Sequence, residues 1–185
     1  RIGVSGWVHM PMVDHNVHDM VKATIMVTEY CDWDFIKIMS TGHYPPEAWG
    51  GDITLSKDLT HWYGVINRYP IRDLETLNNL EILDSNNPVF QRETAIARKL
   101  VEHYQKEKPV ISTIFTPLTT LQELMSRGTN DKTLPLMKEH KEEVHRALEK
   151  IVESTRNYLD MLIEEAHIDG IFFANQYATR NVITE

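Results

Sequence analysis

Hydrophobic positions along the chain follow two alternating patterns: short near-continuous apolar runs, and longer stretches in which apolar residues recur every three or four positions. The short runs predict strands at residues 2–8, 35–39, 110–115 and 171–174. The periodic stretches predict helices over about 17–31, from Asn87-Pro88 to about 108, from Thr116-Pro117 onward, and over about 141–166. Strands and helices in alternation are typical of βαβ units around a parallel sheet, so the sequence indicates the α/β class.

The number and size of these units limit the choice of fold. Four strand-and-helix units fit either a doubly wound sheet or the first half of a (β/α)8 TIM barrel, which needs four more units. No internal repeat or linker composition is present, so residues 1–185 are expected to form one domain. Segment 43–69 exceeds the usual loop length, and such loops commonly carry function or short extra elements. Because the chain begins with Arg1 rather than Met, we expect it to be part of a longer gene product.

The charge balance and the cysteine count narrow the range of partners. Asp and Glu number 27 against 19 Lys and Arg, a net charge of −8, and no basic cluster of the kind that holds nucleic acid or an anionic membrane is present. A local basic pocket for a small anion is still compatible with this composition. Cys31 is the only cysteine, so no intrachain disulfide can form and a reducing cytoplasm is the expected setting. The apolar runs are too short to span a membrane.

The carboxyl ends of the predicted strands are where chemistry is expected, because parallel barrels build their active sites there. The candidate side chains at these ends are Trp7, His9, Ser40, Thr41, Tyr44, Thr116, Asn175, Gln176 and Tyr177. We assign a catalytic role to His9, whose imidazole can carry protons or bind zinc, and substrate binding to the others. The sequence contains no nucleophile elbow, phosphate-binding loop, dinucleotide fingerprint or His-Glu-x-x-His motif.

The residues after the second predicted strand suit the binding of a substrate rather than nucleophilic attack. Ser40 and Thr41 can orient a ligand through their hydroxyl groups, but neither lies in a motif that activates a nucleophile. Tyr44 and Trp49 can form an aromatic wall for a flat ligand, or they can simply pack the long loop.

The other candidates offer hydrogen bonds of different kinds. Thr116 opens a helix directly after a strand, where free N–H groups favour a carboxylate or a phosphate. Asn175 and Gln176 provide both donors and acceptors without charge, which suits direct contact with a substrate. His15 and His18 stand three residues apart near a predicted helix start, where they either share a metal or form an exposed cap region.

Four stretches, taken together, resemble one protein family. They are Asp34-Phe35-Ile36-Lys37-Ile38-Met39, Ala48-Trp49-Gly50, Thr113-Ile114-Phe115-Thr116-Pro117-Leu118-Thr119 and Asp169-Gly170-Ile171-Phe172-Phe173-Ala174-Asn175-Gln176. In this order they resemble the uroporphyrinogen decarboxylase superfamily, in particular its decarboxylase-like branch. The resemblance implies a (β/α)8 barrel, of which this chain carries the N-terminal half. It also implies an enzyme with lyase chemistry, the decarboxylation of a small or flat anionic substrate.

The sequence departs from the porphyrinogen decarboxylases of this family at two places. Those enzymes carry two arginines after the first strand and an Asp after the second strand, and both motifs bind the tetrapyrrole. Here residues 6–10 read Gly-Trp-Val-His-Met, and Ser40-Thr41-Gly42 follows the second strand. The groups that would neutralise a polycarboxylate tetrapyrrole are absent, which argues against porphyrinogen as the substrate.

Two alternatives remain beside the decarboxylase. The same resemblance implies zinc-dependent methyl transfer between a corrinoid protein and a thiol, with zinc ligands in the second half of the barrel. A hypothesis of another class is a half-barrel that serves as a binding or dimerisation module. A chain that truly ends at Glu185 cannot close a barrel and would expose strand edges, so a homodimer of half-barrels would cover them.

Overall fold

The computed structural model of the protein describes residues 2–58, 64–126 and 132–176. The helices are α1 (Val17–Tyr30), α2 (Tyr44–Ala48), α3 (Leu74–Asn78), α4 (Pro88–Tyr104), α5 (Pro117–Met125), α6 (Thr133–Glu139) and α7 (Lys141–Glu164). The strands are β1 (Ile36–Lys37), β2 (Asp52–Thr54), β3 (Val65–Arg68), β4 (Val110–Phe115) and β5 (Gly170–Ala174). The α/β class that the hydrophobic pattern indicates is therefore confirmed. Within the described ranges, no helix has the length and apolar character needed to traverse a bilayer.

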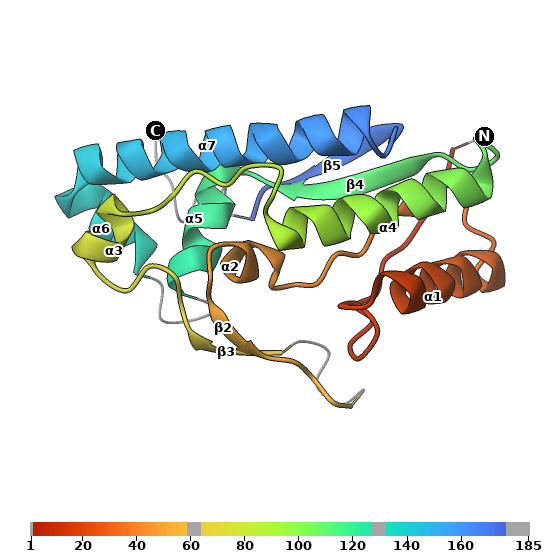
Figure 1. Ribbon diagram of the computed structural model, residues 1–185, viewed down its shortest axis with the longest axis horizontal. Helices are drawn as coiled ribbons and strands as arrows, with labels where there is room; N and C mark the ends of the chain where they lie inside the picture. Colours follow the sequence, from red (N-terminus) through yellow and green to blue (C-terminus); the bar gives the residue numbers. More distant parts are fainter. Residues whose placement is uncertain (1, 59–63, 127–131, 177–185) are drawn as a thin grey trace.

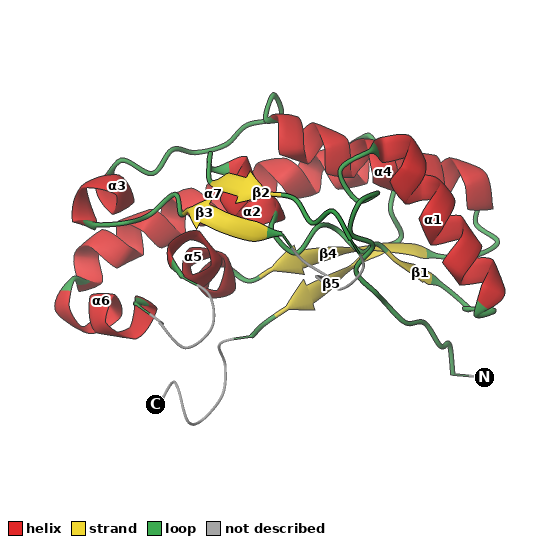
Figure 2. Ribbon diagram, turned by 90° about the horizontal axis from the view of Figure 1, so that it is seen from below, coloured by secondary structure: helices red, strands yellow, loops and turns green. Residues whose placement is uncertain are grey.

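Three strands form a parallel sheet in the order β1-β4-β5. Figure 1 shows β4 beside β5, and Figure 2 shows all three strands. Ile36 pairs with Val110 across the first junction, and Ile111 pairs with Gly170 across the second. Helices α1, α4 and α7 lie on one side of this sheet (Figure 2). Parallel neighbours joined by helices are the arrangement expected for part of a (β/α) barrel, in which the helices form the outer layer.

Residues 2–8, which the apolar pattern predicts to be a strand, do not form one. The segment is held next to β1 through Asp34, whose N–H donates to the Val4 carbonyl at 2.8 Å and whose carboxylate accepts from the Val4 N–H at 2.9 Å. Further along, the Val8 N–H donates to Sδ of Met39 instead of a backbone carbonyl. The repeating backbone exchange that defines a ladder is therefore missing. The described residues place three strands in the parallel sheet, not the expected four.

The buried faces of the helices follow from their apolar spacing. Helix α4 begins where predicted, because the Asn87 side chain accepts from the N–H groups of Val89 and Phe90 and Pro88 occupies the first turn. One core cluster packs α1, α4 and α7 against the sheet, with the rings of Phe90 and Tyr158 stacked 4.7 Å apart. A second cluster joins α3, α5 and α7, in which Ile151 is fully buried.

The long segment 43–69 carries short additional elements, as its length indicates. Helix α2 follows directly after His43, and the antiparallel pair β2–β3 forms a separate two-stranded sheet. The Nε2 of His43 lies 2.8 Å from the carbonyl of Gly64, which ties the start of α2 to the hairpin. Two short helices, α3 and α6, are elements that the sequence pattern does not predict. Helix α3 begins with a capping box between Asp73 and Thr76.

Candidate active site

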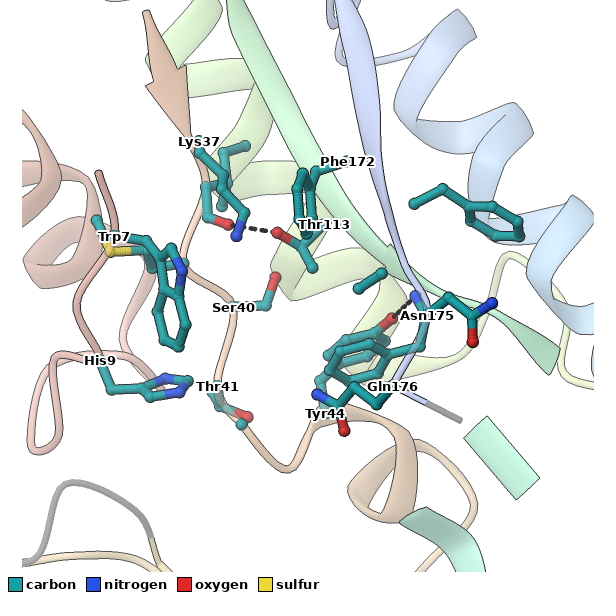
Figure 3. A pocket seen from close by; sticks show the side chains of 16 residues that line it. Trp7, His9, Lys37, Ser40, Thr41, Tyr44, Thr113, Phe172, Asn175 and Gln176 are labelled. Atoms are coloured by element: carbon teal, nitrogen blue, oxygen red, sulfur yellow. Dashed lines mark hydrogen bonds between the residues drawn. The ribbon is translucent and has the colours of Figure 1, made fainter. Parts of the chain in front are cut away.

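A pocket of about 570 Å³ opens at the carboxyl ends of β1, β4 and β5 (Figure 3). The structure brings these predicted site residues together in its lining: Trp7, His9, Ser40, Thr41, Tyr44, Asn175 and Gln176. Thr116 does not belong to the lining, and Tyr177 lies outside the described residues. Trp49 packs against Phe90 at 6.5 Å in an edge-to-face contact and is also absent from this pocket, so it is loop packing rather than part of an aromatic wall.

The alternation of the strands decides which side chains reach the pocket. In β4, Val110, Ser112 and Ile114 are buried on the helix side, so Thr113 and Phe115 face the pocket. The parallel register pairs Thr113 with Phe172 and Phe115 with Ala174, and paired residues share a face of the sheet. The pocket floor is therefore the face of the sheet opposite the helices.

The sequence-based assignment missed several residues of this floor, among them Thr113, Phe172 and the charged Lys37. Ile36 and Ile38 are buried in the core, so the intervening Lys37 points to the other face and into the pocket (Figure 3). Its Nζ lies 4.9 Å from the centre of the Trp7 ring and 3.8 Å from that of Phe172. Partial burial lowers the pKa of Lys37 below its ordinary value. The signal was present in the sequence, because Lys37 is the only charged residue in the run 35–39.

Tyr44 forms a fixed wall at the carboxyl end of β4. Its ring stacks on Phe115 with centroids 5.5 Å apart and planes inclined by 15°. Its hydroxyl accepts from the Phe115 N–H at 3.4 Å, and burial raises the pKa of Tyr44, which keeps it a neutral phenol. The Thr113 hydroxyl donates to the Ile38 carbonyl at 3.3 Å, so it joins β4 to the end of β1 (Figure 3).

Thr116 caps a helix instead of lining the pocket. Its hydroxyl accepts from the Thr119 N–H at 3.4 Å and donates to the Thr119 hydroxyl at 2.9 Å. Thr119 Oγ1 also accepts from the Gln176 N–H at 3.1 Å, so the cap anchors the backbone at the end of β5. The Thr116 hydroxyl and the Thr119 N–H thus bond to each other within the cap, and the anion site expected at Thr116 stays a prediction. Asn175 and Gln176 stay exposed at the pocket mouth.

His9, His15 and His18, which follow the first predicted strand, lie in different surroundings. His9 lies at the pocket, with its ring edge-to-face to Trp7 at 4.9 Å. His18 is exposed on α1, and half-buried His15 lies outside the pocket in a charged cluster. Within the described parts of the chain, no group of three or more His, Cys, Asp or Glu side chains is arranged to hold a metal ion.

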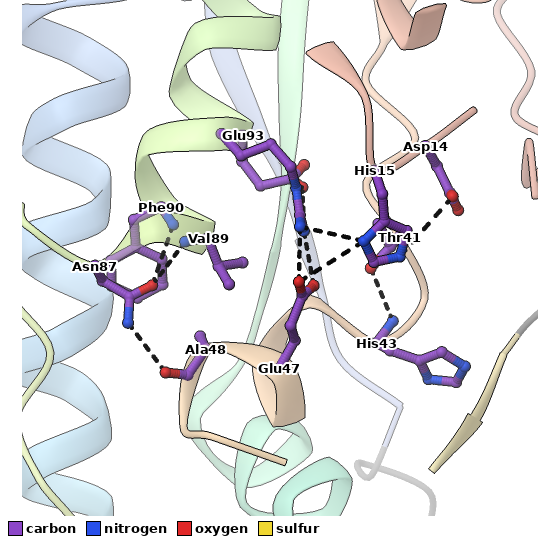
Figure 4. Close-up of polar contacts among 11 residues, drawn as sticks. Asp14, His15, Thr41, His43, Glu47, Ala48, Asn87, Val89, Phe90 and Glu93 are labelled. Atoms are coloured by element: carbon purple, nitrogen blue, oxygen red, sulfur yellow. Dashed lines mark hydrogen bonds and ion pairs between the residues drawn. The ribbon is translucent and has the colours of Figure 1, made fainter. Parts of the chain in front are cut away.

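Asp14, His15, Glu47, Arg92 and Glu93 form a charged cluster, called here the Arg92 cluster. Figure 4 labels Asp14, His15, Glu47 and Glu93 of this cluster. Arg92 donates to both carboxylate oxygens of Glu47, at 2.7 and 2.8 Å, and to Glu93 at 3.1 Å. Its Nη1 also lies 3.3 Å from Nδ1 of His15. A bidentate pair of this kind fixes orientation as well as charge.

The pKa directions within the Arg92 cluster follow from burial and pairing. Burial opposes the charge of Arg92, but its bonds to Glu47 and Glu93 outweigh burial and raise the Arg92 pKa, so the guanidinium stays charged. Burial raises the pKa of Glu93 against the opposing effect of Arg92. Burial lowers the pKa of His15, which favours a neutral imidazole that accepts from Arg92 at Nδ1.

Comparison with known proteins relates the chain to one solved structure and to one protein family. Among solved structures, the chain is similar to a methyltransferase from Methanosarcina mazei, with a TM-score of 0.73 and 17% identity over 94% of this chain and 50% of that one. An identity this low shows the shared fold alone, and the chain spans about half the length of that protein. The family model for uroporphyrinogen decarboxylase (URO-D) matches residues 5–185. The chain therefore belongs to the URO-D family, which confirms the resemblance of its sequence motifs. No curated protein matches significantly.

Proposed function

We propose that the chain forms part of the active site of a lyase that decarboxylates a small or flat anionic substrate. The observation that carries this proposal is the pocket at the carboxyl ends of the strands, which combines one lysine with aromatic walls and neutral hydrogen-bonding groups. This is the usual composition of a small-molecule site, in which apolar surface holds the body of the ligand and a few polar groups fix its orientation. Membership of the URO-D family supports the choice of reaction class.

The pocket residues suit the charge changes of a decarboxylation. The bond between the carboxylate carbon and its neighbour breaks, carbon dioxide leaves, and the electron pair stays on the neighbouring carbon, which then takes a proton. The Lys37 ammonium binds the negatively charged carboxylate of the substrate. Asn175 and Gln176 orient the rest of the ligand. His9 is the group that donates the proton. The rings of Trp7 and Phe172 lie next to the Lys37 ammonium and position it toward the ligand.

Release of carbon dioxide tests this function directly. The chain is incubated with planar carboxylic acids labelled with ¹³C at the carboxyl carbon, and labelled carbon dioxide is measured by mass spectrometry. We expect release from at least one acid that the chain binds, and a rate about 100-fold lower for His9→Gln with binding changed less than about twofold. Gln176→Ala should instead weaken binding with little loss of stability. Binding without release, or no binding at all, would overturn the decarboxylase assignment.

Methyl transfer is the second candidate, because the similar solved structure is named a methyltransferase. A zinc-dependent reaction of this class with a corrinoid partner needs a set of metal-binding side chains. The described residues do not supply one, since no three potential ligands converge there. Zinc bound stoichiometrically to the purified protein, together with transfer of a methyl group to a thiol, would favour this candidate over decarboxylation.

A further inference from the structure

We propose that the ligand of this pocket is a planar aromatic acid with a single negative charge, held by Lys37 through its carboxylate and by the surrounding rings through its body. This inference rests on the proposed function and narrows its substrate class. It depends on three features of the described residues, which are the charges in the lining, the surroundings of the Lys37 ammonium, and the aromatic walls.

The charge of the lining sets the charge of the ligand. Lys37 is the only side chain of fixed charge among the described lining residues, which include no arginine and no carboxylate. One ammonium balances one carboxylate. A second carboxylate would have no cationic partner of fixed charge among the described lining residues, so its binding would gain no comparable ion pair. The lining thus favours a monoanion over a polycarboxylate such as a tetrapyrrole acid.

The Lys37 ammonium is held in position by aromatic rings, and its N–H groups are available to bind a ligand. Its recorded contacts are with the faces of Trp7 and Phe172, and within the described parts of the chain it forms no ion pair. Ring faces attract a cation without accepting a conventional hydrogen bond, so the N–H groups of the ammonium stay available for a carboxylate. The rings also restrict the flexible side chain before the ligand arrives, which reduces the entropy lost on binding.

The walls of the pocket fit a flat ring. Aromatic side chains reach it from three directions, with Trp7 on the N-terminal segment, the stacked pair Tyr44 and Phe115 at the end of β4, and Phe172 on β5 (Figure 3). Offset or edge-to-face contacts with these rings favour an aromatic body. A volume of about 570 Å³ lies in the range of small-molecule pockets and accommodates one or two fused rings with their carboxylate.

A charged ligand and its neutral counterpart of the same shape test the role of Lys37. Affinities of the protein for 2-naphthoate and 2-naphthamide are measured by isothermal titration calorimetry. We expect the chain to prefer the naphthoate about tenfold or more, which is the contribution of a charge-assisted hydrogen bond. Lys37→Met should remove this preference while changing the affinity for the amide less than about twofold. Lys37→Arg should keep the preference, and circular dichroism verifies that both variants are folded.

The pH dependence gives a second readout. The affinity for naphthoate should fall as the pH rises through the pKa of Lys37, at a lower pH than for an ordinary lysine. Lys37→Arg should abolish this fall because guanidinium keeps its proton.

Equal affinity of Lys37→Met and the parent for naphthoate would overturn the inference, as would tighter binding of naphthalene-2,6-dicarboxylate than of the monoacid. Charge-selective binding without release of carbon dioxide from any labelled acid would leave the inference intact and overturn the decarboxylase. If the Lys37→Met variant released carbon dioxide as fast as the parent, the decarboxylase assignment would stand and the inference about Lys37 would be overturned.

Discussion

Arg92 and Lys37 differ in what surrounds their charges, because carboxylates bind Arg92 and aromatic rings face Lys37. Arg92 has a side chain 14% exposed and is bound by the carboxylates of Glu47 and Glu93. Lys37 faces the rings of Trp7 and Phe172 and has no ion pair within the described ranges. A cation that the protein has already neutralised serves the fold. A cation that faces a pocket and is not neutralised is suited to a ligand.

The loop after β1 contacts the pocket on one side and the Arg92 cluster on the other. Ser40, Thr41 and Tyr44 line the pocket, while Glu47, one turn after Tyr44 on α2, is fixed by Arg92 on α4 (Figure 4). The Arg92 cluster thus positions the pocket loop without entering the pocket. The comparison predicts that changes at Arg92 act on stability and that changes at Lys37 act on binding.

Removing the paired cation is expected to have the largest effect on stability. Arg92→Met leaves Glu47 and the buried Glu93, 1% exposed, without their common partner, which should lower the free energy of unfolding by about 3 kcal/mol. Urea denaturation of the variant and the parent measures this loss. The matched control is Arg146→Met, which removes an exposed cation 4.0 Å from Glu142 and should cost less than about 0.5 kcal/mol. A loss below about 1 kcal/mol for Arg92→Met would show that the cluster is not structural.

A smaller effect is expected when one carboxylate of the pair becomes neutral. Glu47→Gln keeps an oxygen that accepts from Arg92 but removes the charge and the bidentate geometry, so the free energy of unfolding should fall by about 1.5 kcal/mol. If Glu47 acts through Arg92, the double variant with Arg92→Met should cost clearly less than the sum of the two single changes. Full additivity in denaturation experiments would contradict this coupling.

Removing the unpaired cation should hardly change stability. Lys37→Met gives up cation–π contacts of about 0.5–1 kcal/mol but also removes a partly desolvated charge, so the net change should stay below about 1 kcal/mol. Thermal unfolding followed by circular dichroism measures this difference. A destabilisation as large as that of Arg92→Met would mean that Lys37 serves the fold, and the contrast between the two regions would fail.

The smallest predicted effect is the contribution of His15 to the pH dependence of stability. Burial keeps the pKa of folded His15 below 6.5, so on acidification the unfolded chain binds this proton first. The contribution of His15 to stability is therefore complete above about pH 6.5 and is lost as the pH falls through the lower folded pKa. Urea unfolding at pH 7 and pH 5 should show a steeper loss for the parent than for His15→Asn. Equal slopes would show that burial does not lower the pKa of His15.

Local sequence signals predicted much of the fold and part of the candidate site. The Asn87-Pro88 cap, the strand 110–115 and the long final helix depend on neighbouring residues alone, and the structure has all three. The strand expected at 2–8 failed because a strand needs a partner that exchanges backbone hydrogen bonds with it, and Met39 takes the place of one. Thr116 has the position of a binding residue in the sequence, but its hydroxyl serves the cap of α5.

The sequence by itself determined the α/β alternation, the family and the strand ends at which the candidate pocket lies, because these depend on periodicity, turn residues and local motifs. Only the tertiary structure decided the roles of the charged residues. Lys37 lies in an apolar run of the sequence and Arg92 lies between Gln91 and Glu93, but neither context shows that Arg92 pairs with Glu47 or that Lys37 faces aromatic rings. That depends on contacts between elements far apart in sequence, such as α2 with α4 and β1 with β5. The physical reason is that the energy of a charge depends on what surrounds it in space.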